Sequence, residues 1–383
     1  MEIILFLFTS TVKRRIISNN EKPMKHLILL SLLLFCFTIK ASCMSSLRFL
    51  VSSKLHLELH FEMKLKKGAS QLGKYQKVSF YNKAFSKEVE ELVIETIDQI
   101  SGDLKSSKVF TTSDEISVSC DSNCKSSAWH FHHLFFNQDL LNKSSRLSTQ
   151  QKKAVVAHEY GHLLFNRKVS ETFPDLTELW KYENKEYVQR FLEETELAER
   201  SLLKQQELLD KFIVYPIYKS LGELFADSVG VLYTGEANVF KDIVYSLKGK
   251  SVSNQSNLLE NKHLYREFRK GEVDLVPEVS ADTHQVFYLA REKVYPYLEK
   301  AFDNPKASEK VLGDILSAGQ ETLEYFFRYD PQTSETFNNF LYKIKLLKKT
   351  NQELSLSEQQ SFKKIILDIN RIFVEKFESK VRI

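Results

Sequence analysis

The segment of residues 154–165 constrains the fold of this chain more than any other part of the sequence. Small and apolar side chains surround two histidines and a single carboxylate there, in the order His158-Glu159-x-x-His162. Residues four apart lie on one face of a helix, so both imidazoles can reach one metal ion with Glu159 beside them. A helix so apolar is expected to be buried, and burying these polar groups is costly unless a cation satisfies them.

A metal ion in a catalytic site usually has three protein ligands, so we expect a third outside this helix. Lys168 stands six residues after His162, which excludes a third histidine at that position. Glu223 and Asp227 lie four apart in a later apolar helix. We expect Glu223 to bind the metal and Asp227 to accept a hydrogen bond from the far nitrogen of His158. Four glutamates of a very charged stretch are rivals for the ligand role, but none has an aspartate four residues on: Glu193, Glu194, Glu196 and Glu199.

The pattern H-E-x-x-H followed by E-x-x-A-D on a later helix resembles the gluzincin metallopeptidases, the thermolysin-like clan of zincins. The likeness covers residues 148–233, roughly a fifth of the chain. Gly222 stands where thermolysin-type proteins often carry Asn, and the aminopeptidase motif G-x-M-x-N is absent. The resemblance therefore implies a peptidase that cuts within a polypeptide substrate.

The resemblance also implies one zinc ion per chain and roles for individual residues. His158, His162 and Glu223 would be the zinc ligands, and Glu159 would be the general base. Asp227 would accept a hydrogen bond from the zinc ligand His158. Gluzincins have a further histidine or tyrosine that stabilises the oxyanion. His284, at the start of an expected helix that continues through Tyr288 and Arg291, resembles that residue, and a helix-capping or exposed histidine is the alternative.

Interpretations without a metal site remain open. His158 and His162 could be core histidines whose hydrogen bonds are all made within the protein, and Glu223 could be a surface residue at the start of a helix. The chain could be a catalytically silent zincin-fold envelope protein that binds zinc and a partner, or a structural helical protein with a chance motif. The intact Glu159 favours catalysis, because a degenerate site commonly loses its base first.

A histidine-rich segment precedes the motif helix. Residues 128–136 are typical of one strand and include His130, His132 and His133. In zincins a strand at this place borders the cleft and pairs with the substrate backbone. A second metal site is the alternative. The long helix expected over residues 182–213 could act as a lid or be a solvated bundle helix.

The hydrophobic pattern indicates an α+β fold, with a zincin-like small mixed sheet and the catalytic helix in the N-terminal half and a mostly α-helical C-terminal half. Only 11 glycines and 7 prolines occur, which favours long helices. Ser148 and Gln151 form a capping box at the motif helix. Strands are expected at residues 55–65, 116–118 and 128–136, and helices at 86–100, 148–165, 182–213, 221–232, 284–302, 307–328, 332–348 and 357–379.

Four regions are expected. Residues 1–42 hold an upstream extension and a signal peptide, residues 43–147 an α+β subdomain, residues 148–240 the zinc-binding helices with the inserted helix, and residues 241–383 a helical C-terminal subdomain.

The N-terminus predicts export. Met24, the expected start, and Lys25 precede an uncharged stretch over residues 27–39 that is too short to span a membrane. Cys43 after small residues resembles a lipoprotein signal, so the chain could be lipid-anchored to the envelope, periplasmic or secreted. Lys40 departs from that signal, and ordinary cleavage near Ala41 is the alternative.

Charge and cysteine content narrow the partners further. Residues 1–42 carry six basic and two acidic side chains, which leaves 48 of each sign in the remainder. A chain without excess positive charge is a poor candidate for sequence-independent nucleic-acid binding. Cys120 and Cys124 could form a local disulfide in an oxidising compartment.

Overall fold

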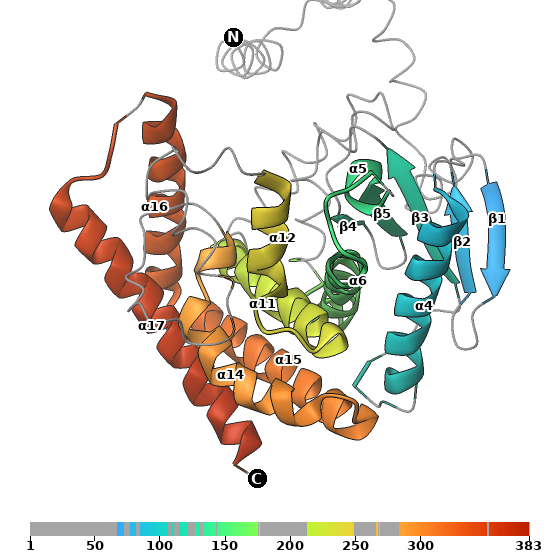
Figure 1. The fold of residues 1–383 in the computed structure, drawn as a ribbon. Coiled ribbons are helices and arrows are strands. Elements are labelled where there is room, and N and C mark those ends of the chain that lie inside the picture. The colour runs from blue at the N-terminus through green and yellow to red at the C-terminus, as the bar shows by residue number, and fades with distance from the viewer. Residues whose placement is uncertain are drawn as a thin grey trace, which may run out of the picture.

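The computed structural model describes residues 67–72, 77–81, 85–105, 107, 109–110, 115–121, 127–129, 133–142, 144–174, 176, 213–248, 266, 268, 283–350 and 352–382. Figure 1 shows a small sheet with one helix at one side, two helices in the middle and a set of long helices at the other side. The expected signal peptide, Cys43, the strand over 55–65 and the helix over 182–213 lie outside these residues.

The sheet has five strands in the order β1-β2-β3-β5-β4. They are β1 (Lys67–Leu72), β2 (Lys77–Tyr81), β3 (Glu115–Asp121), β4 (Ser127–Trp129) and β5 (His133–Asn137). The three inner strands β2, β3 and β5 run parallel, and β1 and β4 pair antiparallel at the two edges. The prediction of a single strand over residues 128–136 was wrong, because the chain forms two antiparallel strands there, β4 and β5.

One face of the sheet is apolar because alternate residues of a strand point to the same side. That face carries Val78, Phe80, Ile116, Val118, Leu134 and Phe136, all buried in the core. Helix α4 (Lys87–Leu104) contributes Val93, Ile97 and Ile100 to the same core. The short helix α5 (Gln138–Leu141) follows β5.

The middle of the protein consists of α6 (Thr149–Thr172) and α11 (Tyr215–Thr234). The expected capping box of α6 is present: Ser148 accepts a hydrogen bond from the Gln151 amide, and the Gln151 side chain accepts one from the Ser148 amide. Helix α11 begins six residues earlier than expected and ends at Gly235, whose φ of 70° suits a residue without a Cβ. Helix α12 (Val239–Lys248) follows directly.

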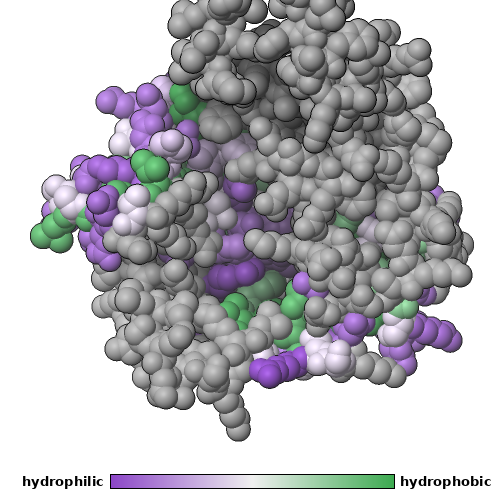
Figure 2. Space-filling view, turned by 90° about the horizontal axis from the view of Figure 1, so that it is seen from above, coloured by the Kyte–Doolittle hydropathy of each residue, from purple (hydrophilic) through white to green (hydrophobic). Residues whose placement is uncertain are grey.

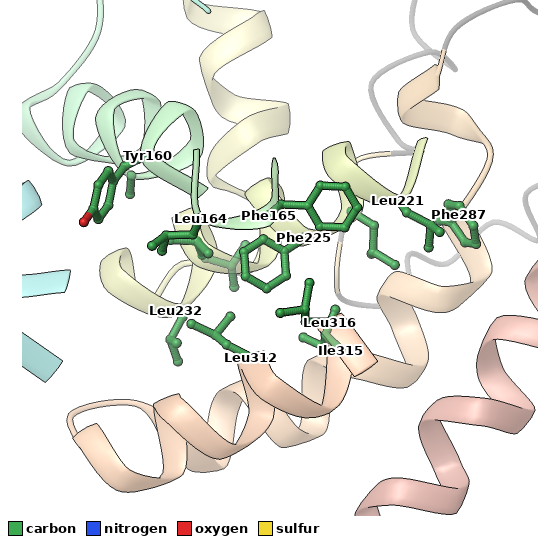
Figure 3. Close-up of a cluster of buried hydrophobic side chains, with 14 of the residues drawn as sticks. Tyr160, Leu164, Phe165, Leu221, Phe225, Leu232, Phe287, Leu312, Ile315 and Leu316 are labelled. Atoms are coloured by element: carbon green, nitrogen blue, oxygen red, sulfur yellow. The ribbon is translucent and has the colours of Figure 1, made fainter. Parts of the chain in front are cut away.

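The C-terminal part is helical, as expected. The 3-10 turn η3 (Thr283–Gln285) precedes α14 (Tyr288–Ala301), α15 (Pro305–Arg328), α16 (Pro331–Lys349) and α17 (Leu356–Val381). The last three are capped by Asn304, Asp330 and Ser355. Figure 3 shows α15 meeting α6 and α11 through Leu312, Ile315 and Leu316, which pack below Phe165 and Phe225. The observed fold is therefore mostly helical with a small sheet, which agrees with an α+β class.

The turn end of the α16–α17 hairpin projects from this body, while the C-terminal part of α17 lies along α14 (Figure 1). Seen from above, the turn end shows hydrophilic and hydrophobic side chains interspersed (Figure 2). The large apolar side chains that are exposed within the described residues all lie in or beside these two helices: Tyr329, Tyr342, Leu346, Leu356 and Leu367. None of the helices in the described part of the chain is long and apolar enough to cross a membrane.

Gly161 fixes the distance between α6 and α11. A Cβ at this position would lie 2.9 Å from the Cα of Ala226, closer than side chains tolerate. The two helix backbones approach closely here because Gly161 has no side chain. The His158-Glu159-x-x-His162 motif of α6 therefore lies close to α11.

We expect Gly161→Ala to lower the free energy of unfolding by about 1–3 kcal/mol, because the backbone of α11 cannot yield as a side chain can. Gly313→Ala in α15 is the matched control. Its Cβ would meet only Val109 at 3.6 Å, so the better helix propensity of alanine should give about 0.5–1 kcal/mol of stabilisation. Urea unfolding followed by circular dichroism measures both, and equal effects would contradict this account of the contact.

Candidate metal centre

Two helices supply the polar groups of the candidate centre. His158 and His162 lie one turn apart on α6, and Glu223 and Asp227 lie one turn apart on α11. Each pair shares a face of its helix, and the contact at Gly161 brings the two faces together. The structure thus places four of the residues singled out from the sequence at one point.

The atoms of His158, His162 and Glu223 form a small triangle. The Nε2 atoms of the two histidines lie 3.0 Å apart. Glu223 Oε2 lies 3.6 Å from His158 Nε2 and 3.4 Å from His162 Nε2. Bonds of about 2.0–2.2 Å at tetrahedral angles would separate ligand atoms by about 3.3–3.6 Å. The two sides that end at Glu223 have this length and the side between the histidines is shorter, so the group could hold a metal ion after a small separation of the two rings.

The chemistry of the group points the same way. Glu223 Oε2 is buried and makes no aligned hydrogen bond, although imidazole nitrogens approach it from several directions. A buried carboxylate oxygen among imidazole nitrogens is a ready ligand for a positive ion in the same space. The side chains of His162 and Glu223 remain 19% and 16% exposed, so an ion can reach them. Two imidazoles and one carboxylate are common ligands of borderline divalent ions.

Asp227 lies behind His158, as expected from the sequence. Its Oδ1 is 3.0 Å from His158 Nδ1, although the two atoms are poorly aligned for a hydrogen bond. This contact leaves Nε2 of His158 facing the triangle. Burial lowers the pKa of His158 to about 4, which keeps its ring neutral and able to bind a metal near neutral pH.

Two arginines compensate the charge of Asp227, which is fully buried. Arg291 Nη2 donates to Asp227 Oδ2 at 2.8 Å, and Arg266 donates to both carboxylate oxygens. Burial alone would raise the pKa of Asp227, but the two guanidinium groups and His158 hold it well below its usual value. Asp227 is therefore a fixed anion. The sequence offered no signal for Arg266, one of several basic residues in a polar stretch.

Arg266 also reaches across the edge of the centre. Its guanidinium lies over the ring of Phe240 in α12, 4.6 Å from the ring centroid. The ring of Phe240 in turn lies 5.3 Å from that of His158. Helix α12 thus covers one side of His158 with an aromatic ring, which restricts the rotation of the imidazole.

His284 approaches the centre from the C-terminal part. The sequence predicted it at the start of a helix, and the structure places it on η3, ahead of α14. Its Nε2 is 2.9 Å from Glu223 Oε2. His284 is outside the three-atom group that could hold a metal, and its side chain is 29% exposed. Burial would raise the pKa of Glu223, yet His284 and His162 hold it well below the usual range. Tyr288 and Arg291 follow on α14, where both are buried.

Glu159 is buried beside the two histidines on α6. Its burial raises the pKa of the carboxyl to about 7, an effect that His162 opposes and Glu223 reinforces. The pKa of His162 is raised, because the carboxylates of Glu223, Glu159 and Asp227 outweigh the effect of burial. Glu159 is therefore a carboxyl group that can both take up and release a proton near neutral pH.

Several other residues considered from the sequence do not join this group. His133 is buried in β5 and its Nε2 lies 2.9 Å from Ser119 Oγ, so it takes part in the sheet. His130, His132, Cys124 and the rival glutamates lie outside the described residues, as does the side chain of Cys120. The domain boundaries and the disulfide therefore stay predictions.

Comparisons of the chain with protein-family models, with curated proteins and with solved structures found no match. The geometry of the centre therefore has to carry the functional argument by itself.

We expect the purified protein to bind one zinc ion per chain through this group. Glu223→Gln should weaken zinc binding more than about 100-fold, because an amide oxygen carries no charge to offset the ion. Glu324→Gln, at a partly exposed glutamate of α15, is the matched control and should leave affinity unchanged. Isothermal titration with a competing chelator measures both, and zinc binding that survives Glu223→Gln would place the site elsewhere.

The raised pKa of Glu159 predicts a pH-dependent effect on stability in the metal-free protein. The folded state holds the proton up to about pH 7 and the unfolded state only up to about 4.5, so this group destabilises the fold progressively across that interval. Glu159→Gln should therefore be about 2–3 kcal/mol more stable than wild type at pH 8 and nearly equal at pH 4.5. Thermal unfolding in chelator across this range measures the difference, and a constant offset at all pH values would contradict the assignment.

Proposed function

We propose that this chain is an exported, zinc-dependent metallopeptidase of the gluzincin type that cuts within polypeptides. The observation that carries the proposal is the triangle of His158 Nε2, His162 Nε2 and Glu223 Oε2, with the buried carboxyl of Glu159 on the next residue of α6. Export rests on the sequence of residues 24–42 alone.

Zinc held by this triangle would supply a polarised carbonyl and an acidified water. Glu159 takes a proton from the attacking water and returns it to the departing amine. A carboxyl with a pKa near neutral suits both transfers, and a neighbouring cation would shift this pKa downward. The proton thus travels through one side chain that needs no other acid.

Asp227 and His284 serve the reaction from opposite sides. Asp227 fixes the ring of His158 from behind, and its two arginine partners keep it ionised. His284, beside Glu223 on the partly exposed side, is placed to donate a hydrogen bond to the oxyanion. These roles are proposals that the distances support.

The edge of the sheet suggests where a substrate binds. β4 is an edge strand within the described residues, and it lies against α6. An extended peptide can add to such an edge through backbone hydrogen bonds. This arrangement favours a polypeptide substrate, bound beside the helix that carries Glu159.

Cleavage of a mixed proteome by the zinc-loaded mature chain tests the proposal. New peptide ends, identified by mass spectrometry, should appear with wild type and with the Glu324→Gln control. With Glu159→Gln they should fall at least about 100-fold while zinc stays bound, because the base is lost and the ligands are kept.

Equal cleavage by Glu159→Gln would rule out the assigned base. If zinc binds but wild type produces no new ends, the silent zinc-binding protein becomes the better description.

A further inference from the structure

The start of α14 lacks a cap of its own. A helix N-terminus leaves backbone amides without partners, and a side chain at the N-cap position usually accepts from one of them. The N-cap residue of α14 is Phe287, which has no polar side-chain atom and makes no capping hydrogen bond. Helices α6, α15, α16 and α17 have a local cap, whereas α4, α11 and α14 have none.

Asn370 of α17 supplies the missing cap from a distance. Its Oδ1 accepts a hydrogen bond from the amide of Ala290, the third residue of α14, at 3.1 Å. Its Nδ2 donates to the carbonyl of Val286 and, at 2.8 Å, to that of Ile366. The side chain is 1% exposed and all its contacts are inside the protein. A residue 80 positions further along thus binds both sides of the junction between η3 and α14.

The same junction carries His284. Val286, whose carbonyl Asn370 binds, is two residues after His284. Arg291 holds the other side, because its Nη1 donates to the carbonyl of His284 at 2.8 Å. The rings of Phe287 and Phe373 add an edge-to-face contact between the junction and α17. The turn is therefore held in place by one polar side chain from α14 and one from α17.

We propose that Asn370 is a positioning residue: it caps α14 from α17 and thereby holds the turn of His284 at the distance from Glu223 that the centre needs. The catalytic part of this inference rests on the proposed function, while the structural part does not. Asn370 touches none of the metal-ligating side chains in its recorded contacts, so it acts only through the turn.

The test compares Asn370→Leu, which keeps the branched shape of the side chain but removes all three hydrogen bonds, with Phe362→Leu. Phe362 is buried on the same helix and contacts Phe337 and Phe340 of α16, away from the junction. Both variants should lower Tm, because both change the packing of α17. Only Asn370→Leu should raise deuterium uptake in peptides covering residues 284–291, with amide exchange at least tenfold faster.

In the peptidase assay Asn370→Leu should lower kcat about 10–100-fold with KM and zinc stoichiometry unchanged, because a displaced donor acts on the transition state. Asn370→Asp keeps the acceptor for Ala290 and should restore part of the exchange protection. Unchanged exchange at residues 284–291 in Asn370→Leu overturns the inference. If no variant, wild type included, cleaves any peptide while the exchange difference persists, the proposed function fails and the capping role stands.

Discussion

The contact between α6 and α11 at Gly161 is the constraint on which the rest of the centre depends. A Cβ added to Gly161 would lie only 2.9 Å from the Cα of Ala226, so the two helices pack closely here. The ligand atoms converge because they project from both sides of this contact, one turn apart on each helix. The apolar layer beneath, where α15 meets both helices (Figure 3), fixes their orientation.

The buried carboxylate of Asp227 is the second feature that shapes the candidate centre. Asp227 is enclosed by two arginines and one histidine, so its negative charge is compensated without help from solvent. Arg291 is fully buried and connects this carboxylate to the backbone of His284. The network therefore joins the back of the candidate centre to the turn of His284, and replacing Asp227 alone leaves the buried guanidinium of Arg291 without its carboxylate.

Local signals in the sequence predicted much of this arrangement. Contacts between residues far apart in the sequence could not be predicted. The capping box at Ser148 predicted the start of α6, because capping depends on adjacent residues. The i,i+4 pairs of α6 and α11 predict shared faces for the same reason. β1 was missed because its sequence shows little apolar alternation, and β2 because its alternation covers only five residues. The break between β4 and β5 has no strong turn signal. Arg266 and Asn370 were missed because their partners lie 39 and 80 residues away.

The cap supplied by Asn370 also bears on the order in which the centre is assembled. A ribosome delivers the two ligand-bearing helices first, then the turn of His284, and the residue that fixes this turn only later, in α17. Until α17 has docked, a nascent or partly folded chain can bring its two helices together, but the turn of His284 is held by Arg291 alone. For the peptidase proposed above, this order would leave the site incomplete for most of its synthesis and would shield neighbouring polypeptides from premature cleavage.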